Sequence, residues 1–402
     1  MSFRKITFPN SEGLQLGARL DLPAGRPTAY ALFAHCFTCS KELQAVDEIS
    51  QALTGEGIAV FRFDFTGLGE SEGDFADTNF SSNVADLVTA AAFMAAEYEG
   101  PQLLIGHSLG GAAVLQAAGS IPSARAVATI GAPSDPDHVQ HLLVEALPEI
   151  EARGEARVRL AGREFNIKKQ LLEDLERTNM QETIANLRKA LLVMHGPLDN
   201  IVSIDNAAEI FKAAKHPKSF VTLDQADHLL SNPDDACYAG KLLAAWALKY
   251  IETATADTSW HDDRVAVRTA DGYYTEVYAQ GHNLIADESI KSGGTDQGPD
   301  PYGFLLGGLG ACTSITLRMY ADRKGWPLES IVVRLSHEKI RAQDCEECET
   351  KEGRVDRITR DLILNGPLDE EQLARLVEIA DRCPVHRTLR SETVIKTNLV
   401  RE

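Results

Sequence analysis

The chain has 402 residues, of which 44% are hydrophobic and 25% charged, and its formal net charge is −19. This length exceeds one ordinary hydrophobic core and predicts two or three domains. The acidic balance argues against nucleic acid or an anionic membrane as a partner, because both need a basic face. No apolar run reaches the roughly 18 residues of a membrane span. The first residues lack the apolar segment of a signal peptide, so we expect the cytoplasm as location.

Short β-rich segments alternate with helical ones through the first 252 residues. This alternation predicts βαβ units and a mostly parallel sheet. In chain order, strands are expected at 4–10, 14–22, 30–35, 58–65, 102–107, 124–132, 190–196 and 219–224, and helices at 40–57, 81–98, 110–119, 204–215 and 235–252. One charged, largely helical segment, 136–186, interrupts the alternation and predicts a lid over the site.

A polar, aperiodic stretch at 253–263 is interpreted as a linker, and 264–402 as an α+β domain around one long buried helix. Asp271–Gly272 is typical of a hairpin turn. The long helix should begin at Asp300–Pro301 and end at Gly325. Further strands are expected at 330–340, 357–365 and 392–400, and helices at 369–383 and 384–389.

Ser108 lies in Gly-His-Ser-Leu-Gly, between an apolar strand and a small-residue helix. That context is what a nucleophile elbow requires, since small neighbours let the backbones approach. A serine nucleophile needs a base and an orienting acid, in the chain order Ser, Asp, His. His228 and Asp199 each follow a predicted strand and should lie at the same sheet edge as Ser108. Asp224 and Asp227 compete as the acid, but neither ends a strand.

Residues 1–250 resemble the α/β-hydrolase superfamily, including its Asp-x-x-Gly-x-Gly-x-Ser-x-Gly segment at 64–73. The resemblance implies an acyl-enzyme on Ser108, with His228 as general base and then general acid. It also implies an oxyanion hole from the backbone N–H groups of Phe37 and Leu109. Three other histidines are interpreted as structural: His35, His107 and His195.

Cys36 stands where the family's oxyanion loop has glycine, and Cys39 follows near the start of a helix. Helix N–H dipoles lower a thiol pKa. Three interpretations stay open for this pair: reduced loop thiols, a disulfide that acts as a redox brake on the hydrolase, and a zinc site. For a second Cys-x-x-Cys, Cys345 and Cys348, the open interpretations are surface thiols, a resolving or regulatory disulfide, and a zinc site, for which a lone pair is weak support. Cys237 is expected to be packed.

Cys312 falls midway along the long helix and Cys383 at a break between two helices. By residue physics alone, both could be small packed hydrophobes. Residues 263–402, however, resemble the OsmC/Ohr family in the Gly-Ala-Cys helix, the Cys-Pro-Val segment and the closing strand. This resemblance implies organic hydroperoxide reduction, with Cys312 peroxidatic, Cys383 resolving and a dithiol as reductant. It also implies an intertwined homodimer.

Two departures weigh on that resemblance. The family's peroxidases carry a glutamate about ten positions before the first cysteine, where this chain has Tyr302. The activating arginine is not evident either, and Arg268 and Arg382 are the candidates considered. A binding or dimerisation module is therefore an alternative for this half of the chain.

Together the two halves predict a serine hydrolase for a small-molecule ester or thioester, fused to a thiol domain that reduces hydroperoxides. No cofactor and no metal are expected. The alternatives are a hydrolase with a non-catalytic OsmC-like module, a hydrolase gated by its dithiols, and a peptidase, because peptidases share this motif set.

Overall fold

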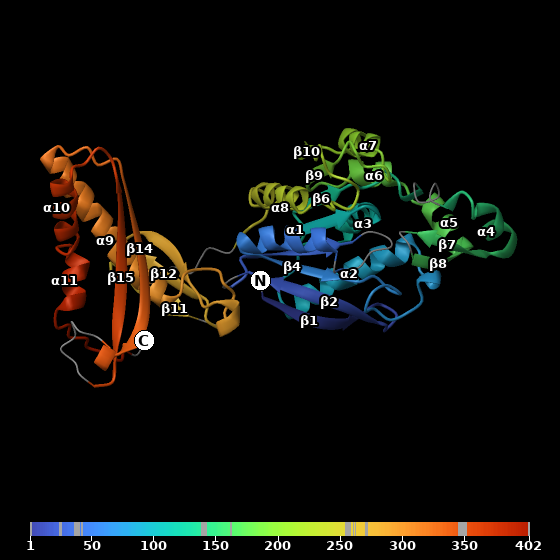
Figure 1. The fold of residues 1–402 in the computed structure, drawn as a ribbon. Coiled ribbons are helices and arrows are strands. Elements are labelled where there is room, and N and C mark those ends of the chain that lie inside the picture. The colour runs from blue at the N-terminus through green and yellow to red at the C-terminus, as the bar shows by residue number, and fades with distance from the viewer. Residues whose placement is uncertain are drawn as a thin grey trace. The chain divides into compact units, whose positions relative to one another are not determined.

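The computed structural model divides into two compact units, Met1–Trp260 and His261–Glu402 (Figure 1). Each unit is described by itself below. The structure describes residues 2–23, 26–35, 41, 43–137, 143–160, 163–253, 259, 261, 263–269, 272–344 and 352–400. Among these residues, no helix is long and apolar enough to cross a membrane.

An eight-stranded sheet forms the centre of the first unit, in the order β1-β2-β4-β3-β5-β6-β9-β10. Strands β1, β2 and β4 pair antiparallel, whereas all the remaining pairs are parallel, as the sequence predicted. The strands are β1 (Ser2–Pro9), β2 (Gln15–Leu22), β3 (Ala29–Ala34), β4 (Ile58–Phe63), β5 (Leu103–His107), β6 (Ala126–Ile130), β9 (Ala190–His195) and β10 (Lys218–Thr222).

Helices cover both faces of this sheet (Figure 1). Alternate strand residues point to opposite faces, so Leu32 and Phe61 belong to one apolar cluster and Phe33 and Val60 to the other. The first cluster includes α2 (Phe80–Glu97), α3 (Leu109–Ala117) and α7 (Asp205–Ala213); the second includes α1 (Gln44–Gly55) and α8 (Pro233–Ala247). Burial of both faces explains the near-continuous apolar runs of these strands.

The insertion between β6 and β9 is only partly helical, which corrects the sequence-based expectation. It contains α4 (Leu147–Arg153), β7 (Glu155–Leu160), β8 (Arg163–Lys168), α5 (Lys169–Glu176) and α6 (Met180–Ala185). Strands β7 and β8 form an antiparallel hairpin. Ala156, Phe165 and Ile167 are buried from this hairpin, and the spacing of two between Phe165 and Ile167 is that of a strand rather than a helix.

The second unit is an α+β arrangement around the long helix α9. Asp300 caps this helix by accepting the N–H of Gly303 at 2.6 Å, Pro301 is its first residue, and Gly325 ends it with φ of 66°. The elements are β11 (Ala266–Thr269), β12 (Thr275–Ala279), β13 (His282–Ala286), α9 (Pro301–Lys324), β14 (Ser330–Arg341), β15 (Arg354–Asn365), α10 (Glu370–Ala380) and α11 (Pro384–Arg390).

Three expectations for this unit need correction. Strand β13 was not anticipated; it follows a tight turn in which Gln280 and Gly281 both have positive φ. Helix α9 was expected to be buried, but its buried residues form a single stripe. Residues 392–400 were expected to be a strand, yet they have no regular structure, and Ile395 is 86% exposed. A strand is stable only when a neighbour pairs with its backbone.

Candidate active site

Ser108 occupies a sharp turn between β5 and α3, with φ of 56° and ψ of −128°. This left-handed conformation is costly for a residue with a side chain, and such strain concentrates at functional sites. Glycine is required at 106 and 110, on either side of Ser108, because other backbone atoms lie very close to these positions. A Cβ on Gly106 would lie 2.2 Å from the carbonyl oxygen of Gly110, and one on Gly110 would lie 2.4 Å from that of His35. The turn has the geometry that the sequence predicted for a nucleophile elbow.

The three side chains proposed as a triad form one hydrogen-bonded chain. His228 Nε2 lies 2.9 Å from Ser108 Oγ, and His228 Nδ1 lies 2.7 Å from Asp199 Oδ2. Asp199 follows β9 and His228 follows β10, so the carboxyl ends of neighbouring parallel strands bring them to Ser108. In the neutral ring, Nδ1–H donates to Asp199 and leaves Nε2 to accept the serine proton.

Asp199 is held as a carboxylate. Burial alone would raise its pKa, but hydrogen bonds from His195 and His228 and from the backbone N–H of Val202 hold the pKa well below its usual range. Asp227, the competing acid next to His228 in sequence, instead accepts the N–H of Ser231 at 2.8 Å. The contact to the imidazole therefore comes from the residue that follows a sheet strand.

Two buried histidines support the triad without taking part in it. His107 Nε2 lies 2.6 Å from the carbonyl oxygen of His228, and burial lowers the pKa of His107 to about 4. His107 is therefore neutral at pH 7 and donates Nε2–H to that carbonyl. His195 Nε2 lies 2.8 Å from the carbonyl oxygen of Val202, the residue whose N–H binds Asp199. Both histidines have the structural surroundings that the sequence suggested.

One half of the predicted oxyanion hole lies in the described part of the chain. Leu109 is the first residue of α3, and N–H groups in the first turn of a helix have no partner within that helix. Gly110 packs against the backbone of His35, so the chain that leaves β3 passes beside this first turn. Phe37, Cys36 and Cys39 follow directly and lie outside the described residues.

A buried ion-pair network, which sequence reasoning missed, surrounds Lys41. Lys41 is 1% exposed, and its Nζ lies 2.7 Å from Asp64 and 2.8 Å from Glu70. Its backbone N–H also donates to Asp64, at 2.8 Å. Arg62 donates to the carbonyl oxygen of Lys41 at 2.6 Å. The network therefore anchors the chain just after residues 36–40. An apparently ordinary lysine in a loop gave no sequence signal for it.

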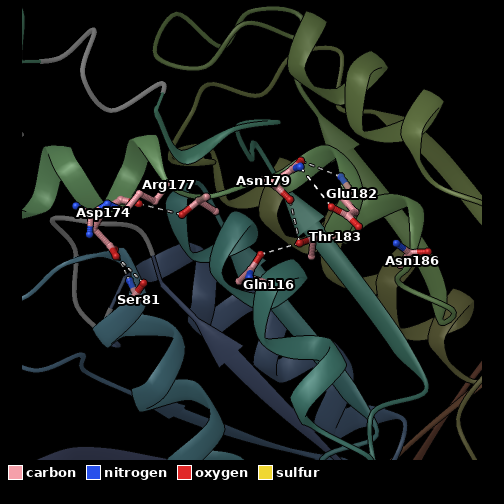
Figure 2. Close-up of a pocket in the computed structure, with 9 residues that line it drawn as sticks. Ser81, Gln116, Asp174, Arg177, Asn179, Glu182, Thr183 and Asn186 are labelled. Carbon is pink, nitrogen blue, oxygen red and sulfur yellow. Dashed lines mark hydrogen bonds between the residues drawn. The ribbon is translucent and has the colours of Figure 1, made fainter.

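A polar cavity of about 470 Å³ lies where the insertion meets α2 and α3 (Figure 2). Asp174 accepts two hydrogen bonds from Ser81, at 2.6 and 2.7 Å, and Thr183 donates to Gln116 at 2.9 Å. These bonds fasten α5 and α6 to the body of the unit. Gln116 is eight residues along α3 from Ser108, about 12 Å at 1.5 Å per residue, so this cavity is separate from the triad. The lid role of 136–186 stays a prediction.

The thiols of the second unit have unequal surroundings. Cys383 is fully buried, and its Sγ accepts the N–H of His386 at 3.3 Å. Thr313 Oγ1 lies 3.7 Å from the same sulfur, whereas the preceding residue, Cys312, is half-buried on α9. Arg360, from β15, donates to Thr313 at 3.0 Å. Among the described residues, Arg360 is thus the cationic side chain that hydrogen-bonds to this cluster.

The other residues singled out for this unit lie elsewhere. Arg268 pairs with Glu276 at 2.7 Å across β11 and β12. Arg382 is exposed on the surface after α10. Tyr302, in place of the family's glutamate, stacks on His337 at 4.3 Å between ring centroids. Cys345 and Cys348 lie outside the described residues, and Cys237 is half-buried in α8.

Comparison with known proteins agrees with the fold of both units. The family model described as "Alpha/beta hydrolase family" matches residues 31–240. The chain belongs to the alpha/beta hydrolase family. A second family model, "OsmC-like protein", matches residues 294–398, so the alpha/beta hydrolase unit is followed by an OsmC-like domain.

Several relatives resemble the hydrolase unit. The palmitoyl-protein thioesterase ABHD10 of Mus musculus is 30% identical over 200 residues, which is 48% of this chain and 65% of that protein. The monoglyceride lipase of Rattus norvegicus is 33% identical over 28% of this chain and 38% of its own. This chain thus spans less than two thirds of these relatives. The esterase domain of a Rhodothermus marinus protein is 57% identical over 62% of this chain and 99% of that one, with a TM-score of 0.53.

Proposed function

We propose that the first unit hydrolyses carboxylic esters or thioesters through an acyl-enzyme on Ser108. The observation that carries the proposal is the chain of hydrogen bonds from Ser108 through His228 to Asp199, at 2.9 and 2.7 Å, on a strained elbow. The names of the similar proteins, a thioesterase, a lipase and an esterase domain, support this reaction class.

The proposed reaction has two stages. Ser108 Oγ attacks the substrate carbonyl carbon while His228 Nε2 takes its proton, and Asp199 stabilises the imidazolium that forms. The N–H of Leu109, with that of Phe37, stabilises the oxyanion. His228 then returns the proton to the departing alcohol or thiol. Water repeats the sequence on the acyl-enzyme and releases the carboxylic acid.

A direct test uses 4-nitrophenyl butyrate and an S-acyl thioester of the same chain length. We expect hydrolysis of both by the full chain, a burst of one nitrophenol per chain, and labelling by a fluorophosphonate at Ser108. Ser108→Ala should abolish labelling and lower kcat by about 10⁶. Cys312→Ser is the matched control and should retain full activity. Labelling that persists in Ser108→Ala would overturn the assignment.

For the second unit we propose thiol-dependent reduction of an organic hydroperoxide, supported by Cys383, Thr313 and Arg360 lying together. The Cys312 thiolate attacks the terminal peroxide oxygen, which breaks the O–O bond, forms a sulfenic acid and releases an alcohol. Cys383 condenses with the sulfenic acid to a disulfide and water, and a dithiol restores both thiols. One equivalent of cumene hydroperoxide should consume two thiols in the wild type but not in Cys312→Ser. No loss in the wild type would make this unit a binding module.

We also propose that the second unit assembles with a second copy of the chain. Ile315 and Met319 on α9 are 60% and 68% exposed, and they share a helix face because they are four residues apart. Val332 on β14 is 43% exposed. The apolar residues within 392–400 are exposed as well, and an extended segment of this kind can add to a sheet edge of another chain. A homodimer would cover these surfaces.

A further inference from the structure

A second cavity, of about 520 Å³, lies entirely within the OsmC-like domain. Its walls come from α9, β14, β15 and α11. A volume of this size falls within the range of small-molecule sites, roughly 300 to 1,000 Å³. The cavity adjoins the buried thiol, because the N–H of its lining residue His386 donates to Cys383 Sγ at 3.3 Å.

One part of the lining is apolar. Leu309, which is 4% exposed, contributes from the buried stripe of α9, and Ile340, Val355 and Ile358 contribute from the two long strands. Leu389 of α11 closes this side. Such a surface accommodates an alkyl chain or a ring, since apolar area removed from water favours binding by about 25 cal/mol per Å².

The remaining lining carries a surplus of positive charge. Arg360 is neutralised by Asp381, at 2.6 Å. Arg390 also lines the cavity and has no hydrogen bond or ion pair within the described residues. His386 lies close to both arginines: burial lowers its pKa, as do Arg360 and Arg390, while Asp381 opposes the effect.

Two more charged lining residues have partners of their own. Arg357 pairs with Glu338 at 2.6 Å, and Asp356 pairs with Lys339 at 3.9 Å and accepts a hydrogen bond from His337 at 2.8 Å. They therefore neither add to nor cancel the charge of Arg390. An arginine favours a carboxylate because its planar guanidinium matches two oxygens at once.

We propose that this cavity is a binding site for a carboxylate with an apolar chain or ring, the product class that the hydrolase unit would release. The source of the ligand rests on the proposed hydrolase function, whereas the site itself rests on the lining residues. Arg390 is the residue that binds the carboxylate, and the apolar wall from Leu309 to Ile358 holds the tail.

The test uses octanoate and the full chain after its Ser108 has been blocked with a fluorophosphonate, so that binding at the hydrolase site is excluded. Titration calorimetry should show one octanoate bound per chain. Arg390→Gln should raise the dissociation constant at least tenfold. Arg387→Gln is the matched control, since Arg387 lies one turn earlier on the same helix and does not line the cavity. Octanamide, of the same length without the charge, should bind at least tenfold more weakly.

Three results would overturn the site: no octanoate binding to the blocked chain, equal affinity in Arg390→Gln, or equal affinity for octanamide. The first is also the result expected if a second copy of the chain fills the cavity. The source is tested separately, by hydrolysis of an octanoyl ester with the unblocked chain. Binding that depends on Arg390 without ester hydrolysis would support the carboxylate site and overturn the hydrolase as its source.

Discussion

The two units of this chain differ in how deeply the strands around their candidate sites are buried within one chain. In the first unit, the strands that precede Ser108 and Asp199, β5 and β9, are buried from end to end, and Asp199 receives hydrogen bonds at both carboxylate oxygens. In the second, β14 and β15 alternate between exposed and half-buried residues, and none is fully buried. The hydrogen-bonded chain of Ser108, His228 and Asp199 thus lies within one chain, whereas the second unit exposes apolar residues such as Ile315 and Met319.

The physical origin of the contrast is the number of layers. A parallel sheet with helices on both faces buries its inner strands and can hold the residues at their ends firmly. Two long antiparallel strands with helices on one side leave the other side open. Helix α9 shows the same imbalance, with Leu317 fully buried and Met319, two residues later, 68% exposed.

The largest effect on kcat is expected from a substitution of Asp199, the proposed acid of the triad. Asp199→Asn should lower kcat by about 10⁴, because the amide favours the wrong imidazole tautomer. Asp227→Asn should leave kcat within a few-fold, since its carboxylate binds Ser231 rather than the imidazole. Steady-state ester hydrolysis measures both. The reverse ranking would show that Asp227 is the orienting acid.

The next effect concerns the buried ion pair of Lys41 and Asp64. Burial lowers the pKa of Lys41, but the hydrogen bonds that it donates to Asp64 and Glu70 raise the pKa above its usual value, so the ammonium stays charged. Lys41→Met leaves Asp64 as an unpaired buried charge and should cost about 3–5 kcal/mol in the free energy of unfolding. Glu70→Gln, at a more exposed carboxylate, should cost about 1 kcal/mol or less. Urea denaturation separates the two, and equal losses would contradict the buried-pair interpretation.

A third test uses pH and addresses the buried support of the triad. The pKa of His107 is about 4 in the folded chain, against about 6.5 when unfolded. Between these values the unfolded state binds a proton that the folded state does not, so stability falls as pH decreases from 6.5 to 4. At 1.36 kcal/mol per unit the loss is about 3 kcal/mol.

His107→Gln keeps a donor for the His228 carbonyl and removes the titration, so its free energy of unfolding should change less between pH 7.5 and pH 4 by that amount. His282→Gln, at an exposed histidine of the second unit, is the control and should follow the wild type. Urea unfolding at the two pH values provides the measurement. A variant that loses as much stability as the wild type would show that His107 is not the group responsible.

The smallest expected effect concerns the proposed dimer contact of the second unit. Ile315→Glu with Met319→Glu should weaken a dimer at least a hundredfold, about 2.8 kcal/mol at 1.4 per tenfold, by placing charges in its apolar contact. Light scattering after gel filtration should show half the wild-type mass, with ester hydrolysis unchanged. Lys324→Glu, an exposed change at the end of the same helix, should keep the wild-type mass. A wild-type protein that is already monomeric would contradict the proposed dimer.

Much of the hydrolase site was predictable because its signals are local. A nucleophile elbow needs small residues beside Ser108, and a triad in this fold needs residues directly after strands, which selected Asp199 and His228 before any coordinates. The helix boundaries at Asp300 and Gly325 were equally readable, since capping depends on neighbours in the chain.

The sequence by itself therefore predicted the alternation of strands and helices, the elbow, and the chain order of the proposed triad, Ser108, Asp199 and His228. Only the tertiary structure decided that Lys41 is buried against Asp64, that Arg360 rather than Arg268 lies beside Cys383, and that residues 392–400 form no strand in a single chain. The physical reason is distance along the chain. Burial, ion pairing and strand pairing depend on partners tens of residues away or on another molecule. Local sequence patterns do not identify those partners.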